Sequence, residues 1–209
     1  MANQPHNLPL LATTEICSGG TYIVTGASGG IGFEVVKHLA MLGAAKIILG
    51  VRNVSAGETA KTEIEAATGT SNVTEVWALD LTSYDSVKAF AKRAAMELDR
   101  IDSLIENAGV ASYQRVMAEG HLLDVTVNVL STLLLGVLLL PKMSENAQRF
   151  GILPHIVVVT SQFSFQSEAE WNKIKDSPLV KMDDEDMPVM ETYVAMQLEN
   201  HKPNHLSLS

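Results

Sequence analysis

Hydrophobic positions along this chain alternate between short β-rich runs and longer stretches with helical periodicity, the pattern of βαβ units that build a parallel sheet. The β-rich runs predict strands at Thr21–Thr25, Lys46–Gly50, Val73–Leu79, Ile101–Ile105 and His155–Thr160. The stretches between them predict helices at Gly30–Leu42, Ser55–Ala67, Ser83–Leu98 and, with a break near its start, Gly120–Ala147. We therefore expect a three-layer α/β fold.

Three local patterns sharpen this prediction. Ile31, Val35 and Leu39 recur at four-residue spacing, which predicts the buried face of the first helix. Ser55-Ala56-Gly57-Glu58 has the form of a capping box and predicts the start of the second helix. The run from His155 to Thr160 is apolar, as expected of a strand covered on both faces.

The character of the chain changes after Ser161. The segment Ser167–Asp186 is polar and ends in four consecutive acidic residues, Asp183–Asp186. We interpret these as a solvated loop or helix face and expect no metal site, because consecutive side chains point in different directions. The expected division is an N-terminal extension over 1–18, one domain over 19–199 and an unstructured tail over 200–209.

Composition narrows the function classes. The 209 residues are 46% hydrophobic, which suits one packed domain, and the net charge of -9 argues against a nucleic-acid partner. Cys17 is the only cysteine, so no disulfide or zinc cluster forms within one chain; a reducing, cytoplasmic compartment is expected. The apolar stretch Val127–Leu140 is shorter than the roughly 20 residues that cross a bilayer, so we expect a buried helix and no transmembrane segment.

The clearest candidate for chemistry is the glycine-rich turn Thr25-Gly26-Ala27-Ser28-Gly29-Gly30-Ile31-Gly32, which follows a predicted strand and opens a helix. Gly26 permits a tight turn, Gly30 removes a side chain where a diphosphate would approach, and Gly32 allows the helix to pack closely on the sheet. The free N–H groups at the helix start favour phosphate. This context predicts a dinucleotide site.

The spacing Gly-x-x-x-Gly-x-Gly is followed in order by Asp80-Leu81, Asn107-Ala108-Gly109, Asn128, Ser161 and Tyr193. Over roughly Thr21–Tyr193 this set resembles the short-chain dehydrogenase/reductase superfamily, in particular its retinol-dehydrogenase-like fungal branch. The resemblance implies a Rossmann fold of about five strands in the order 3-2-1-4-5. It also implies a nicotinamide cofactor and a small-molecule carbonyl or alcohol as substrate, with no nucleic acid.

The resemblance assigns cofactor contacts along one edge of the sheet. The implied residues are Gly26, Ser28, Gly30, Ile31, Gly32, Arg52, Asp80, Asn107, Ala108, Gly109 and Tyr193. Asp80 would contact the adenine, although its position near Thr82 and Ser83 also suits a helix start. Arg52 stands where an acidic residue would bind the ribose of NAD, so NADP is favoured over NAD; the alternative is an ordinary surface arginine.

Catalysis is implied for Ser161, Tyr193 and Asn128, which would orient the substrate oxygen, transfer its proton and join the proton relay. Two features depart from the family. The lysine of Tyr-x-x-x-Lys is Gln197, which cannot stabilise a phenolate by charge. In the family's Asn-Asn-Ala-Gly motif, the first asparagine is Glu106.

Two functions stay open. One is an NADP-dependent oxidoreductase, plausibly in fungal secondary metabolism; the other is a catalytically impaired nucleotide-binding remnant, since the family's last strands have no counterpart after Gln197 and the chain looks truncated. A five-stranded sheet would leave the flank of its fifth strand exposed. The helix carrying Leu133–Leu140 often pairs subunits in the family, which leaves homo-oligomerisation open.

Overall fold

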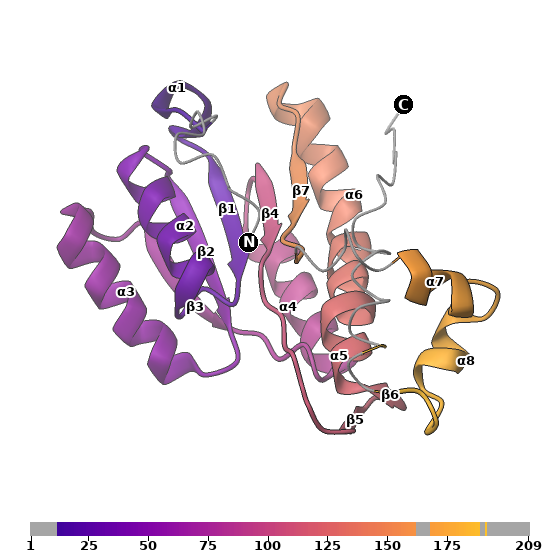
Figure 1. The fold of residues 1–209 in the computed structure, drawn as a ribbon. Coiled ribbons are helices and arrows are strands. Elements are labelled where there is room, and N and C mark those ends of the chain that lie inside the picture. Colours follow the sequence, from indigo (N-terminus) through magenta and orange to yellow (C-terminus); the bar gives the residue numbers. More distant parts are fainter. Residues whose placement is uncertain (1–11, 162–167, 189–190, 192–209) are drawn as a thin grey trace.

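The central feature is a five-stranded parallel sheet in the order β3-β2-β1-β4-β7 (Figure 1). The computed structural model describes residues 12–161, 168–188 and 191. Its sheet strands are β1 (Thr21–Thr25), β2 (Lys46–Val51), β3 (Thr74–Ala78), β4 (Ser103–Glu106) and β7 (His155–Val158). All five predicted strands are present, and the predicted order 3-2-1-4-5 is confirmed with β7 as the fifth.

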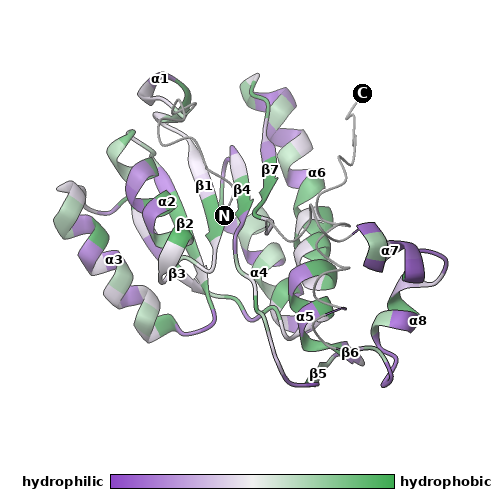
Figure 2. Cartoon of the chain, viewed as in Figure 1, coloured by the Kyte–Doolittle hydropathy of each residue, from purple (hydrophilic) through white to green (hydrophobic). Residues whose placement is uncertain are grey.

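Helices cover both faces of this sheet, because strand residues alternate between the two sides. Ile23 packs in one core with α4 (Tyr84–Glu97) and α6 (Thr132–Phe150). Val24 packs in the other with α2 (Gly30–Met41) and α3 (Val54–Thr68). Hydrophobic colour accordingly runs along the strands, while hydrophilic colour marks the outer turns of α3 (Figure 2). The short α1 (Thr14–Cys17) adds buried Cys17 to the second core.

The first two helices differ in detail from their predictions. The buried face of α2 is formed by Gly32, Val36, Leu39 and Ala40. The prediction is confirmed for Leu39 and for Val35, which packs against the same core, but it was wrong for Ile31, which is 65% exposed. Gly32 lies against the Asn107 side chain and the Gly26 carbonyl at the helix start. In α3 the N-cap is Asn53, whose side chain accepts a hydrogen bond from the Ala56 N–H. Ser55 already lies inside the helix, so the predicted capping box does not form.

The fourth predicted helix begins later and ends later than expected. The first predicted residues instead belong to a small antiparallel pair, in which β6 (His121–Leu122) lies within the predicted helix and β5 (Met117–Ala118) lies just before it. The chain turns between them at Glu119 and Gly120, which both have positive φ. It then continues through α5 (Leu123–Val125), the π-helical segment η1 (Thr126–Ser131) and α6. The sequence missed this hairpin because each strand is only two residues long.

The helical run Leu123–Phe150 is long and apolar enough to cross a membrane, so the argument that the stretch was too short was wrong. Of its most apolar window, however, 61% is buried inside the fold. Leu135, Leu139 and Met143 of α6 pack in the core with α4 and the sheet. This run is therefore apolar because it is a helix buried in the core of the fold.

The last strand of the sheet is more open than predicted. His155, Ile156 and Val157 of β7 are exposed, the valine to 46%. The expectation of a strand covered on both faces was wrong, because β7 lies at the edge of the described sheet. The expected exposed flank is present.

The acidic segment after Ser161 forms two helices, α7 (Glu168–Ile174) and α8 (Pro178–Met182). Ile174 and Met182 pack with Leu122, Val125 and Val129. Asp183 departs from the expectation of a solvated acidic side chain. Its carboxylate accepts a hydrogen bond from the Leu122 N–H at 2.9 Å and lies 2.6 Å from His121 Nδ1. The segment is thereby bound to the β5–β6 pair.

Candidate active site

The candidate site lies where the strand order reverses between β1 and β4, at the carboxyl ends of the strands. Thr25, the last residue of β1, ties the two loops together. Its hydroxyl accepts hydrogen bonds from the N–H groups of Asn107 at 3.0 Å and Ala108 at 2.9 Å. The Asn107 amide donates to the Thr25 carbonyl at 3.1 Å. Sequence reasoning gave Thr25 no role, although it opens the glycine motif.

Two glycines of the motif are required by close contacts with this asparagine loop. Gly26 has φ of +66°, and a Cβ there would lie 2.9 Å from Ala108 Cα. A Cβ on Gly32 would lie 2.6 Å from both Asn107 Nδ2 and the Gly26 carbonyl oxygen. Both distances are too short for real atoms, so the predicted tight turn and close helix packing are confirmed.

The outer part of the turn is open. Gly30 has φ of +56°, and a Cβ there would meet nothing within 4 Å. Ser28, Gly29, Gly30 and Ile31 are exposed, and no side chain caps the start of α2. The first-turn N–H groups of a helix lack intrahelical partners and carry its positive dipole end. This turn therefore fits a diphosphate, which a nicotinamide dinucleotide contains.

The residues assigned to the adenosine end lie farther along the same edge. Arg52 directly follows β2 and is exposed. Asp80 follows β3, and its Oδ1 accepts hydrogen bonds from the N–H and the hydroxyl of Thr82, at 2.9 and 2.7 Å. Asp80 thus orders the turn before α4, whose N-cap is Ser83. The sequence had suggested two roles for Asp80, an adenine contact and a place at the start of a helix. These hydrogen bonds show the second.

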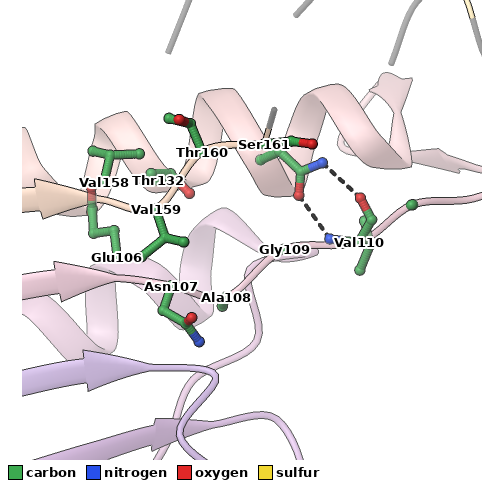
Figure 3. A pocket seen from close by; sticks show the side chains of 12 residues that line it. Glu106, Asn107, Ala108, Gly109, Val110, Thr132, Val158, Val159, Thr160 and Ser161 are labelled. Atoms are coloured by element: carbon green, nitrogen blue, oxygen red, sulfur yellow. Dashed lines mark hydrogen bonds between the residues drawn. The ribbon is translucent and has the colours of Figure 1, made fainter. Parts of the chain in front are cut away.

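A cavity of about 250 Å³ opens between the loop after β4, the π-helical segment and the end of β7 (Figure 3). It is lined by Glu106, Asn107, Ala108, Gly109, Val110, Ala111, Asn128, Thr132, Val158, Val159, Thr160 and Ser161. The structure thus brings the asparagine motif together with two of the three predicted catalytic residues, Asn128 and Ser161. Tyr193 and Gln197 lie outside the described residues.

Asn128 holds the wall of this cavity. It is 8% exposed and lies within the π-helical segment, a distortion frequent at functional sites. Its Oδ1 accepts a hydrogen bond from the Val110 N–H at 2.8 Å, and its Nδ2 donates to the Val110 carbonyl at 2.7 Å (Figure 3). A Cβ on Gly109 would lie 3.2 Å from Asn128 Oδ1. Asn128 therefore fixes the backbone of the loop after β4.

Glu106 is a site residue that sequence reasoning noted only as a departure from the family motif. It ends β4, is 4% exposed, and its Oε1 is buried without a hydrogen-bond partner. Burial raises the pKa of Glu106 to about 8. The signal available in the sequence was an ionisable residue at the end of a strand predicted to be central in the sheet.

The sequence pattern of the short chain dehydrogenase family matches residues 21–173, which include the glycine turn, the asparagine loop, Asn128 and Ser161. The chain belongs to this family. Its relatives include the short chain dehydrogenase/reductase dmxR8 of Cryptosporiopsis, 45% identical over 69% of this chain and 45% of the relative. The short-chain dehydrogenase anuD of Penicillium roqueforti is 35% identical over 91% of this chain and 53% of the relative. The short chain dehydrogenase sol3 of Alternaria solani is 39% identical over 87% and 64%.

This short-chain dehydrogenase chain spans about half the length of the first two relatives. Solved structures share its fold. A short-chain dehydrogenase from Sphingobium yanoikuyae in complex with NADPH has a TM-score of 0.64 at 24% identity, covering 86% of this chain and 61% of that one. A 3-ketoacyl-(acyl-carrier-protein) reductase from Brucella melitensis complexed with NADH has a TM-score of 0.66 at 23% identity, covering 88% and 66%.

Proposed function

We propose that this chain forms the NADP-binding part of an oxidoreductase that interconverts a carbonyl and an alcohol on a small organic molecule. The observation that carries the proposal is the glycine turn, whose inner glycines are fixed by contacts with the Asn107 loop and whose outer N–H groups are open. The family match over residues 21–173 supports the same conclusion.

In this proposal the protein holds the cofactor along one edge of the sheet. Gly26, Ser28, Gly30, Ile31 and Gly32 form the diphosphate cradle, and Asp80, Asn107, Ala108 and Gly109 border the adenosine side. The nicotinamide, when bound, supplies or accepts a hydride. Exclusion of water and orientation of the substrate are left to the chain itself.

Arg52 is proposed to select NADP over NAD. Its guanidinium carries the planar donor fork that suits a phosphate, and it lies two residues beyond Gly50, the register partner of Thr25. Solved structures of similar fold include complexes with NADPH and with NADH, so the proposed preference for NADP rests on Arg52.

Substrate chemistry is proposed at the cavity beside Asn128. Ser161 would donate a hydrogen bond to the substrate oxygen, and Tyr193 would exchange its proton. Asn128 would hold the loop that borders the substrate. A fungal secondary metabolite is the proposed substrate class and the cytoplasm the proposed location, following the family resemblance. Pairing of two chains through α6 is part of the same proposal.

Cofactor titration of the purified 209-residue chain tests this function directly. Tryptophan fluorescence or calorimetry should show saturable NADPH binding, with weaker NADH binding. Arg52→Glu should weaken NADPH binding by about tenfold to a hundredfold, since hydrogen bonds to charged groups contribute about 1.5–3 kcal/mol. NADH binding should change little. Lys92→Glu, on the exposed face of α4, is the matched charge control. Equal losses for both cofactors would refute the role of Arg52.

A second candidate is favoured by one observation: Gln197 replaces the lysine of the family's Tyr-x-x-x-Lys motif. This candidate is a nucleotide-binding protein without turnover. Absorbance assays of NADPH oxidation with a panel of aldehydes and ketones separate the two candidates. NADPH binding without turnover in the native chain and in Gln197→Lys would support the second.

A further inference from the structure

Glu106 stands at the inner wall of the cavity and is not used by the proposed chemistry. It shares the face of β4 with Leu104, which packs in the core with α4 and α6. On α6, Gly136 lies beside this side chain, and a Cβ there would lie 3.9 Å from Glu106 Oε1. On the other side its register partner is Val158 of β7. A glycine and a valine therefore flank the carboxyl group.

No counter-charge reaches this carboxyl from the described elements packed around it. β1 and η1 contain no charged residue. On β7 the titratable residue is His155, at the opposite end of the strand, and on α6 the first cation is Lys142, nearly two turns beyond Gly136. The charged side chains of α4 are on its exposed face: Asp85, Lys88, Lys92, Arg93 and Glu97. Desolvation therefore acts on Glu106 unopposed, and at neutral pH it holds a proton.

Glu106 nevertheless borders the site, because it lines the same cavity as Asn128 and Ser161. Figure 3 shows Glu106 and Ser161 among the side chains that line it. The cavity volume of about 250 Å³ accommodates several water molecules, since one occupies about 30 Å³ in the liquid. Three hydroxyl-bearing residues, Thr132, Thr160 and Ser161, belong to its lining, and the Thr132 hydroxyl donates to the Val127 carbonyl. Water in the cavity and these side chains are the groups through which a proton would pass between Glu106 and a substrate oxygen.

We propose that Glu106 is the proton store of this site, a protonated carboxyl that supplies the proton consumed when a carbonyl is reduced. This inference rests on the proposed function. A carbonyl carbon that accepts a hydride leaves a negatively charged oxygen. The O–H bond of Glu106 then breaks, and an O–H bond forms at the substrate oxygen through the water and hydroxyl groups of the cavity. The Glu106 carboxylate regains its proton from solvent; oxidation of the alcohol reverses these steps.

Because Gln197 replaces the family lysine, the site has need of another proton donor, and Glu106 would supply it. A glutamine at position 197 is neutral and releases no proton near neutral pH. A carboxylic acid with a pKa of about 8 is a stronger acid than an unperturbed tyrosine, whose pKa is about 10. Proton transfer from Glu106 to a phenolate would be favoured about a hundredfold on these values.

The first test measures the protonation of the Glu106 carboxyl as a function of pH, without cofactor or turnover. Carbon-13 NMR of glutamate-labelled protein follows the carboxyl signal that is lost in Glu106→Gln. We expect a titration midpoint near pH 8. A midpoint at the ordinary value for glutamate would overturn the proposal. Glu63→Gln, on the exposed face of α3, controls for assignment of the signal.

The second test measures single-turnover reduction of a carbonyl substrate by NADPH from pH 6 to 9. In the native chain the rate should fall as pH rises through 8. Glu106→Gln should be about a hundredfold slower at pH 7, a typical contribution of general acid catalysis, with unchanged NADPH affinity and no break near pH 8. A native rate and pH profile in this variant would overturn the store. Absence of NADPH binding in every variant would instead refute the proposed function, and the NMR midpoint would still decide whether Glu106 holds its proton.

Discussion

Replacing Glu106 by glutamine is expected to make the fold more stable at alkaline pH and to flatten the dependence of its stability on pH. Glutamine has nearly the shape of a protonated glutamate but never carries the charge. The native carboxyl is 4% exposed and has an unpartnered Oε1. Ionisation in the folded state therefore costs free energy that the variant avoids.

The magnitude follows from the two pKa values. Folding raises the pKa of Glu106 from the ordinary 4.5 to about 8, so the folded state binds the proton more tightly than the unfolded chain. The stabilisation by this group is complete below pH 4.5, falls as pH rises, and is lost above about pH 8. At roughly 1.4 kcal/mol for each pH unit, the loss reaches about 3 kcal/mol at pH 7 and about 5 kcal/mol at pH 9. Domains have total stabilities of about 5–15 kcal/mol, so this change is large.

Urea denaturation at pH 5, 7 and 9, followed by circular dichroism, measures the free energy of unfolding for both proteins. The difference between Glu106→Gln and the native chain should be within about 1 kcal/mol at pH 5 and grow to several kcal/mol at pH 9. Other titrating groups are common to both proteins and cancel in this difference. Glu63→Gln on the exposed face of α3 is the control for replacing a carboxylate that is not buried.

Parallel curves for the native chain and Glu106→Gln would refute the reasoning. They would mean that water or a charge reaches the carboxyl in solution and that the group titrates normally. A variant that is destabilised equally at every pH would also refute it, because packing alone would then explain the effect.

Three further outcomes follow from contacts in the site. Gly32→Ala should destabilise the fold by at least about 2 kcal/mol in urea denaturation and abolish NADPH binding, because its Cβ would lie 2.6 Å from Asn107 Nδ2. Thr25→Val should cost about 2–4 kcal/mol, since two backbone N–H groups lose their acceptor, while Thr25→Ser should remain near native; equal losses would point to packing. Asp183→Ala removes the hydrogen bonds to His121 and to the backbone of β6, so limited proteolysis should cleave the segment 168–188 faster than in Asp176→Ala; equal rates would contradict this attachment.

Much of this fold could be predicted because the decisive signals are local. Strands such as Thr21–Thr25 are marked by β-branched residues and by glycines at their ends. Gly26 and Gly30 indicate positions with positive φ, which the structure has. Burial of a polar chain segment was harder to predict. Asp183 reads as one of four solvated acids, and only the fold places it beside His121.

In the candidate site, too, some residues could be identified from the sequence and others could not. The order of motifs alone identified Asn107, Asn128 and Ser161, and the structure brings them to one cavity. Their partners were not visible in the sequence, since Thr25 and Asn107 are separated by 82 positions.

The sequence by itself determined the five strands, the glycine turn and the family, because these depend on backbone conformation and on spacing along the chain. The strand order followed from the family resemblance. Tertiary structure alone decided that Gly32 and Val36 rather than Ile31 face the core, that β7 is open, and that Asp183 is bound to the β5–β6 pair. Tertiary structure also decided the protonation state of Glu106. A carboxyl acquires its pKa from the groups packed around it, and those groups come from β4, β7 and α6, which meet only in the folded molecule.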